Sequence, residues 1–184
     1  ALDLSQKLKY EKGKGDAYRI RGTAYYYQSN IEKAREEDLL AIAIYEKLPD
    51  CKRQLAHTIN NYGVTYYAVG SYDTAAMYFQ EHLDLQLELG NLDQAAKGYL
   101  NLGVIFKKKG DLPMAQEYYL KAIEMSKEGG SIAVYATALA NMGNIFQSMG
   151  QDSLALAYYR RSIPARIELN DMKGLAQVYN NMGA

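Results

Sequence analysis

The sequence has no tryptophan and, in 184 residues, only one cysteine, three prolines and three phenylalanines. A single cysteine, Cys51, excludes an internal disulfide and a cysteine-based zinc site. Few prolines mean few helix breakers, and the chain lacks the alternating Val- and Ile-rich runs that are typical of β-strands. We therefore expect an all-α protein.

Charge and hydrophobicity exclude further classes. The 21 Lys and Arg residues balance 21 Asp and Glu residues, so the formal net charge is zero. Because nucleic-acid binding needs a surplus of cations, we expect no nucleic-acid partner. No apolar run approaches the roughly 20 residues of a membrane span, so we expect no membrane partner. A hydrophobic content of 48% excludes long-range disorder. The composition is that expected of a folded cytoplasmic protein.

What the sequence does contain is a repeat. An Asn-x-Gly tripeptide recurs with a spacing of 40 residues, and one more glycine, Gly22, lies 41 residues before the glycine of the first tripeptide. After the three central glycines, a second glycine follows at seven residues and an alanine five residues later. These positions are Gly22, Gly63, Gly103, Gly143 and Gly183; Gly70, Gly110 and Gly150; and Ala34, Ala75, Ala115 and Ala155. Such a period indicates a stack of similar units.

Each unit is predicted to be a helical hairpin. Ile59, Tyr62 and Tyr66 follow a helical stripe, which predicts a first helix. Gly70 suits the left-handed residue that ends a helix. A second helix then follows and is expected to end at Gly90. The small residues at the repeated positions would let the two helices approach closely.

The hairpins give a single predicted array over residues 1–184. A turn is expected at Gly13–Asp16, and because no polar cap follows the last helix, we expect a fragment of a longer protein. The predicted parts are the end of a preceding hairpin or a capping helix (1–12), four hairpins (15–48, 50–90, 91–130 and 131–170) and the first helix of a truncated fifth (171–184).

The repeated positions resemble the tetratricopeptide repeat. In the third unit they are Tyr99, Leu102, Gly103, Phe106, Gly110, Ala115 and Tyr119. The resemblance implies a right-handed α-solenoid whose first helices line a concave groove. The period of 40 residues exceeds the usual period of about 34. In their long period, the units are similar to those of kinesin light chains, Pins-type adaptors and bacterial peptide sensors.

An asparagine stands two residues before Gly63, Gly103, Gly143 and Gly183, although asparagine is a poor residue for a helix interior. An amide both donates and accepts, so it can pair with the main chain of an extended peptide. This resembles the asparagine ladders of O-linked N-acetylglucosamine transferase and kinesin light chains. Alternatively, the asparagines tie neighbouring helices together. The candidate groove residues in this register are Asn61, Asn101, Asn141, Asn181, Asn60, Asn144, Arg19, Tyr26, Tyr67, Lys97 and Lys107.

Several patterns argue against other sites. His57 and His82 lack a metal spacing, and Cys51 has no neighbouring base in the sequence, so we expect no metal, no cofactor and no enzyme. The carboxylate clamp of co-chaperones is broken, because Thr23 and Asn101 stand where that clamp has Asn and Arg. Lys107 and its neighbours could equally be an ordinary cationic helix end.

Two charged runs and a proline complete the predictions. Glu36–Asp38 is predicted to be a solvated outer face, and so are Arg160 and Arg161 with Arg166 beyond them. Pro164 is predicted to kink the second helix of its unit.

The sequence thus predicts a non-enzymatic protein-interaction module that binds an extended peptide in its concave groove. It would be the scaffold or regulatory part of a longer signalling protein. Two alternatives stay open. One is a sensor array that controls an attached catalytic or DNA-binding domain, and the other is self-association through the C-terminal helix.

Overall fold

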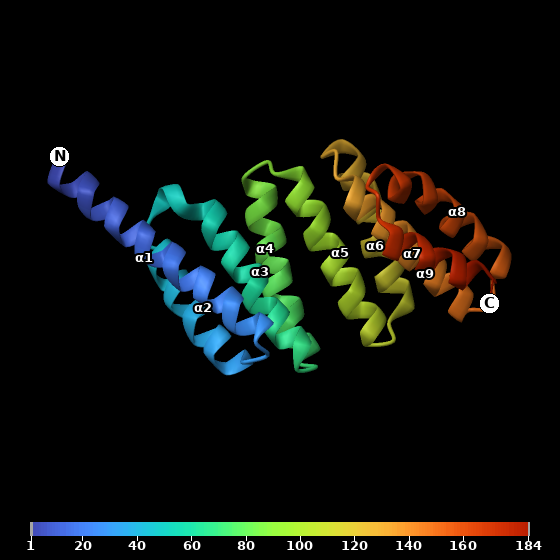
Figure 1. Ribbon diagram of the computed structural model, residues 1–184, viewed down its shortest axis with the longest axis horizontal. Helices are drawn as coiled ribbons and strands as arrows, with labels where there is room; N and C mark the ends of the chain where they lie inside the picture. The colour runs from blue at the N-terminus through green and yellow to red at the C-terminus, as the bar shows by residue number, and fades with distance from the viewer. Residues whose placement is uncertain (1, 184) are drawn as a thin grey trace. The chain divides into compact units, whose positions relative to one another are not determined.

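The computed structural model describes residues 2–183, and the side chains of residues 9–183. The described residues form nine α-helices, one short 3-10 helix and no strand, so the predicted all-α class is confirmed for them (Figure 1). They divide into two compact units, 1–90 and 91–184. The predicted single array across both units stays a prediction, and its ends, Ala1 and Ala184, lie outside the described residues.

The first unit contains two helical hairpins. Its elements are α1 (Leu2–Tyr27), α2 (Ile31–Tyr45), the 3-10 helix η1 (Pro49–Cys51), α3 (Lys52–Ala68) and α4 (Tyr72–Glu88). The helix α1 packs against α2, and α3 packs against α4. Contacts between α2 and α3 join the two hairpins into one body.

The second unit repeats this arrangement and adds a ninth helix. Its elements are α5 (Leu92–Lys108), α6 (Leu112–Glu128), α7 (Ile132–Ser148), α8 (Asp152–Glu168) and α9 (Met172–Gly183). Each helix from α5 to α8 has 17 residues. A core of buried side chains, among them Leu102, Tyr119, Leu139 and Met142, joins α5, α6 and α7.

The predicted helix ends are confirmed. The first helices end at glycines with φ of 79°, 82° and 71°. The second helices end at residues with φ of 63°, 71° and 52°. Glycine adopts this left-handed conformation without steric cost, because it has no Cβ. The residues that end the first helices are Gly70, Gly110 and Gly150, and those that end the second helices are Gly90, Gly130 and Asn170.

The signature glycines bring the two helices of a hairpin together, as predicted. A Cβ added at Gly103 would lie 2.5 Å from the ring of Tyr119, and one at Gly143 would lie 2.5 Å from the ring of Tyr159. The helix α6 therefore packs its aromatic ring directly on the backbone of α5, and α8 packs in the same way on α7.

The predicted turn at Gly13–Asp16 is wrong, because α1 continues through it without a break. Gly15 is buried, and an added Cβ would lie 2.8 Å from the ring of Tyr45 on α2. The hydroxyl of Tyr45 donates to Asp16 at 2.8 Å. Glycine at this place thus serves a close helix contact, and residues 2–12 belong to the same helix as the first unit.

The prediction of a solvated face at Glu36–Asp38 holds for Glu36, which is exposed, and is wrong for Asp38. Arg21 donates to Glu37 at 2.9 and 2.5 Å. Asp38 is only 1% exposed, and its Oδ1 has no hydrogen-bond partner among the described residues. A Cβ added at Gly22 would lie 2.5 Å from that oxygen. The carboxyl of Asp38 therefore points at α1, inside the hairpin.

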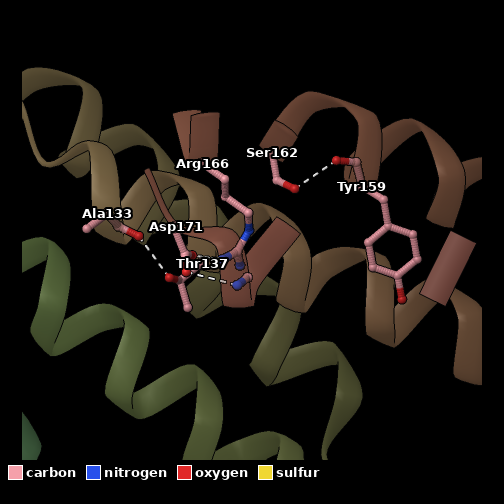
Figure 2. A network of polar contacts seen from close by, with 7 residues as sticks. Ala133, Thr137, Tyr159, Ser162, Arg166 and Asp171 are labelled. Carbon is pink, nitrogen blue, oxygen red and sulfur yellow. Dashed lines mark hydrogen bonds and ion pairs between the residues drawn. The ribbon is translucent and has the colours of Figure 1, made fainter. Parts of the chain in front are cut away.

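Arg166, which was predicted to lie on a solvated face, is buried at 8% exposure. Figure 2 shows its guanidinium reaching Asp171, with which it forms an ion pair, where α8 meets α9. The other carboxylate oxygen of Asp171 accepts from the backbone N–H of Gly174 at 2.9 Å. Helix α8 continues through Pro164, and the kink predicted there stays a prediction.

Replacing Asp171 with alanine should lower the free energy of unfolding by more than the removal of an ordinary surface carboxylate does. The variant loses the cap of α9 and leaves a buried guanidinium without its counter-ion. Urea denaturation checks this, with Asp152→Ala at the exposed start of α8 as the control. Equal losses in the two variants would contradict the role given to Asp171.

Candidate functional site

The repeated asparagines lie on the first helices of the hairpins. Asn61 lies on α3, Asn101 on α5, Asn141 on α7 and Asn181 on α9, and all four are half-buried. We call the surface that the predicted groove residues form in each unit its first-helix face. In the first unit these residues are Arg19, Tyr26, Asn60, Asn61 and Tyr67; in the second they are Lys97, Asn101, Lys107, Asn141, Asn144 and Asn181.

In the first unit, Asn61 ties two helices together. Its Nδ2 donates to Oγ1 of Thr23 on α1 at 3.4 Å. Arg19, one turn earlier on α1, is half-buried, and its Nε has no hydrogen-bond partner among the described residues. Asn60 is buried at 6% exposure, so it offers little surface to a ligand.

Two predicted tyrosines lie near the ends of the same helices, and both are half-buried. Tyr26 lies edge-on to Tyr27, with ring centroids 5.8 Å apart. Tyr67 is tilted against Tyr72 at 5.9 Å. These rings are therefore partly engaged with neighbouring aromatic side chains.

At the C-terminal end of the second unit, the polar residues form a network. Nδ2 of Asn181 donates to Oδ1 of Asn144 at 2.9 Å, and Nε2 of Gln147 donates to the backbone carbonyl of Asn181 at 3.1 Å. The hydroxyl of the buried Tyr159 lies 2.7 Å from Oδ1 of Asn144 and 2.9 Å from Oε1 of Gln147. Here the amides tie α7, α8 and α9 together, as the alternative interpretation expects.

Asn141 differs from these two asparagines. Asn61 and Asn181 each bond the side chain that directly follows the signature glycine of the preceding first helix. For Asn141 that residue is Val104 on α5, whose side chain has no hydrogen-bonding atom. The amide of Asn141 therefore lacks the interhelical partner that its equivalents have at both ends of the chain.

The lysines predicted for the site both lie on α5. Lys97 is exposed, whereas Lys107 is half-buried. Burial, and then repulsion from Lys108, lower the pKa of Lys107. No described carboxylate forms an ion pair with Lys107, so a partly desolvated cation lies at the end of this face without a counter-ion.

Two other candidate reactive groups, the thiol of Cys51 and the imidazole of His82, are buried between helices. Cys51 is 2% exposed, and burial raises the pKa of its thiol. His82 is 1% exposed, with Nδ1 2.9 Å from the carbonyl oxygen of Ala56. Over the described part of the chain, no group of three or more His, Cys, Asp or Glu residues is placed to hold a metal ion. No described helix is long and apolar enough to cross a bilayer.

The comparison with protein families gives one match. A family model described as "Tetratricopeptide repeat" matches residues 14–88 and 94–168, which is most of the chain. The comparison with curated proteins gives no match.

Solved structures with the same fold include three with high similarity. Aspartyl phosphate phosphatase F from Bacillus subtilis has a TM-score of 0.88 at 15% identity, over 92% of this chain and 44% of that one. The Rap conjugation gene regulator of plasmid pLS20, in complex with the Phr* peptide, has a TM-score of 0.78 at 23% identity, over 91% and 46%. A Rap protein complexed with competence and sporulation factor has a TM-score of 0.81 at 20% identity, over 95% and 49%.

These similarities show the fold of the chain and how much of each solved protein it covers. The predicted class, a solenoid of helical hairpins, is confirmed by them. The chain spans less than half the length of each of the three proteins.

Proposed function

The chain belongs to the tetratricopeptide repeat family, and from that premise we propose that it is a protein-interaction module that binds an extended peptide along its first helices. It would serve as the scaffold or regulatory part of a longer cytoplasmic signalling protein. The proposed contact residues are those of the first-helix faces, with Asn60 left out because it is buried.

The amide of Asn141 carries this proposal. It is half-buried on a first helix, and the helix before it offers only Val104 at the place where Asn61 and Asn181 find a polar partner. A side-chain amide can accept a main-chain N–H and donate to a main-chain carbonyl at once, whatever the peptide sequence. Asn101 lies one repeat earlier on α5 and would give the second contact.

Lys107 adds a preference for acidic peptides. It is half-buried and has no paired carboxylate among the described residues. An ion pair with a ligand carboxylate would offset the desolvation that lowers its pKa. We therefore propose that an acidic side chain, or a terminal carboxylate, lies over the C-terminal end of α5.

Two of the similar solved structures contain a bound peptide or factor, and this supports peptide binding as the use of such a face. A third is named for a phosphatase activity. For this chain we propose binding without catalysis, because Cys51, the nucleophile weighed from the sequence, is buried with a raised pKa.

The double variant Asn101→Ala, Asn141→Ala should lose peptide binding. Random peptides displayed on phage are selected against the wild-type chain, and the affinity of the selected peptides is measured by fluorescence polarisation. Each amide contact contributes about 0.5–1.5 kcal/mol, so we expect an affinity loss of at least about fivefold for the two together. For the acidic peptides among them, Lys107→Glu should cause a similar loss.

The control for this experiment is Gln28→Ala, Gln151→Ala, which removes two exposed amides from outside the proposed contact set. Both residues lie in the turns that follow first helices, so the helices themselves stay unchanged. The control should bind like the wild type. Equal affinity in the asparagine variant and this control would overturn the proposal, and the asparagines would then be structural.

Self-association is the second candidate, because α9 exposes large apolar side chains. Met172 is 75% exposed and Tyr179 is 55% exposed. Light scattering over a concentration series tests it. A mass that rises with concentration, and that falls back in a Met172→Glu, Tyr179→Glu variant, would support it. The third possibility is a sensor array that controls an attached catalytic or DNA-binding domain.

A further inference from the structure

A hollow in the second unit lies outside its first-helix face. It has a volume of about 440 Å³ and is formed by the end of α6, the beginning of α7 and the second half of α8. A volume of this size falls in the range of about 300–1,000 Å³ that is usual for ligand sites. The residues used below are Lys127, Ile132, Tyr135, Arg161, Pro164 and Glu168.

One part of the wall is apolar. Ile132 and Tyr135, on the first turn of α7, are half-buried, so each presents some of its side chain to the hollow. Pro164 is exposed on the opposite helix, α8. These three side chains offer a place for one apolar or aromatic group of a ligand.

Two cations stand on this wall, and each lies over an aromatic ring. Nζ of Lys127 is 5.8 Å from the centroid of Tyr135, and Cζ of Arg161 is 5.2 Å from the centroid of Tyr158. The ring faces attract the cations without using up their N–H donors. No described carboxylate pairs with either cation, so both can still bind an anion.

Other groups on the wall limit which ligands fit. Glu168 is the one carboxylate among the lining residues, so the wall keeps a surplus of one positive charge. A ligand with a carboxylate and an apolar side chain matches this set of groups.

We propose that this hollow is a second binding site, which takes a short acidic segment of a partner protein. The apolar side chain of the segment lies between Ile132, Tyr135 and Pro164, and its carboxylate pairs with Lys127 and Arg161. The site shares no residue with the first-helix face, and its existence does not depend on peptide binding there.

The probe for this site is the dipeptide acetyl-Glu-Phe-amide, titrated into the ¹⁵N-labelled chain and followed by amide chemical shifts. We expect saturable shifts at Ile132, Tyr135 and Ala165. The neutral dipeptide acetyl-Gln-Phe-amide should bind about fivefold or more weakly, because it lacks the carboxylate. Shifts confined to α5 and the middle of α7, or none that saturate at the cavity, would overturn the proposal.

Variants separate this site from general charge effects. Lys127→Ala, Arg161→Ala should weaken the acidic dipeptide about tenfold, because two partly exposed ion pairs are lost. The control Lys121→Ala, Arg160→Ala removes the same charge from exposed residues outside the lining and should bind like the wild type. The Asn101→Ala, Asn141→Ala variant should also keep its affinity for this probe. If the cavity variant and the control bind equally, the site does not exist.

Discussion

At pH 7, replacing Asp38 with asparagine is expected to raise the free energy of unfolding by about 3 kcal/mol. In its hairpin, Asp38 occupies the position that Phe79, Tyr119 and Tyr159 occupy in the other three, 16 residues after the signature glycine. All four side chains pack on that glycine. The first hairpin thus has a carboxyl group where the others have an aromatic ring.

The energetic cost comes from burial. Asp38 is 1% exposed, and burial raises the pKa of its carboxyl from 3.8 to about 7. The charge of Arg19 opposes this increase in pKa, and the charge of Glu37 adds to it. At 1.36 kcal/mol for each pKa unit, the ionised carboxylate costs about 4 kcal/mol at and above pH 7. The asparagine amide removes the charge but stays buried, so we expect the gain to be somewhat smaller than this cost.

The dependence on pH has a definite sign. The folded chain holds this proton up to about pH 7, whereas the unfolded chain releases it near pH 3.8. Between these values the folded state binds more protons, so the contribution of Asp38 to stability falls as the pH rises and levels off above about 7. Urea denaturation at several pH values should show this fall in the wild type and not in Asp38→Asn. The control is Asp84→Asn, at an exposed carboxyl on α4, which should keep the fall.

The second large effect is expected at Gly103. Replacing it with valine should lower the free energy of unfolding by about 3 kcal/mol, toward the upper end of the cost of overpacking a core. The first added carbon would already lie 2.5 Å from two ring carbons of Tyr119. That ring is 0% exposed and is enclosed by the core of the second unit, so it has no free space to move into.

The same substitution elsewhere separates packing from helix propensity. Gly13 lies in α1 with nothing within 4 Å of an added Cβ. Gly13→Val should be neutral or gain a few tenths of a kcal/mol, because valine is the better helix former. Melting curves of both variants test this. A small loss at Gly103 would show that α6 can move away from α5 at little cost.

The parts of the fold that the sequence predicted are those that repeat. Gly70, Gly110 and Gly150 mark helix ends because a left-handed residue favours glycine wherever it occurs. The period of the repeat does not distinguish a glycine that ends a helix from a glycine that allows two helices to approach closely. Gly15 allows the ring of Tyr45 to approach α1, and from one sequence it was mistaken for a turn.

Departures from the repeat could not be predicted in the same way. Asp38 and Arg166 were expected on solvated faces because charged residues are rarely buried. A comparison with its equivalents would have found Asp38, which replaces an aromatic residue. Arg166 aligns with Ser126, whose burial only the structure shows. The contacts of the candidate site depend on side-chain partners from the preceding helix. Thr23 and Asn144 accept hydrogen bonds from Asn61 and Asn181. Only these contacts show that Val104 leaves Asn141 without the equivalent partner, and the sequence does not contain them.

The hydroxyl of Tyr159 has one proton and two amide oxygens within reach, at 2.7 and 2.9 Å. Whichever oxygen receives the proton, the other has spare capacity to accept. An incoming N–H could therefore take the place of the phenol at Asn144 while the phenol turns to Gln147, and the number of hydrogen bonds would rise by one. The network that holds α9 against α7 and α8 thus leaves one amide oxygen able to accept another hydrogen bond. A ligand N–H can bind there while the hydrogen bonds between the helices remain.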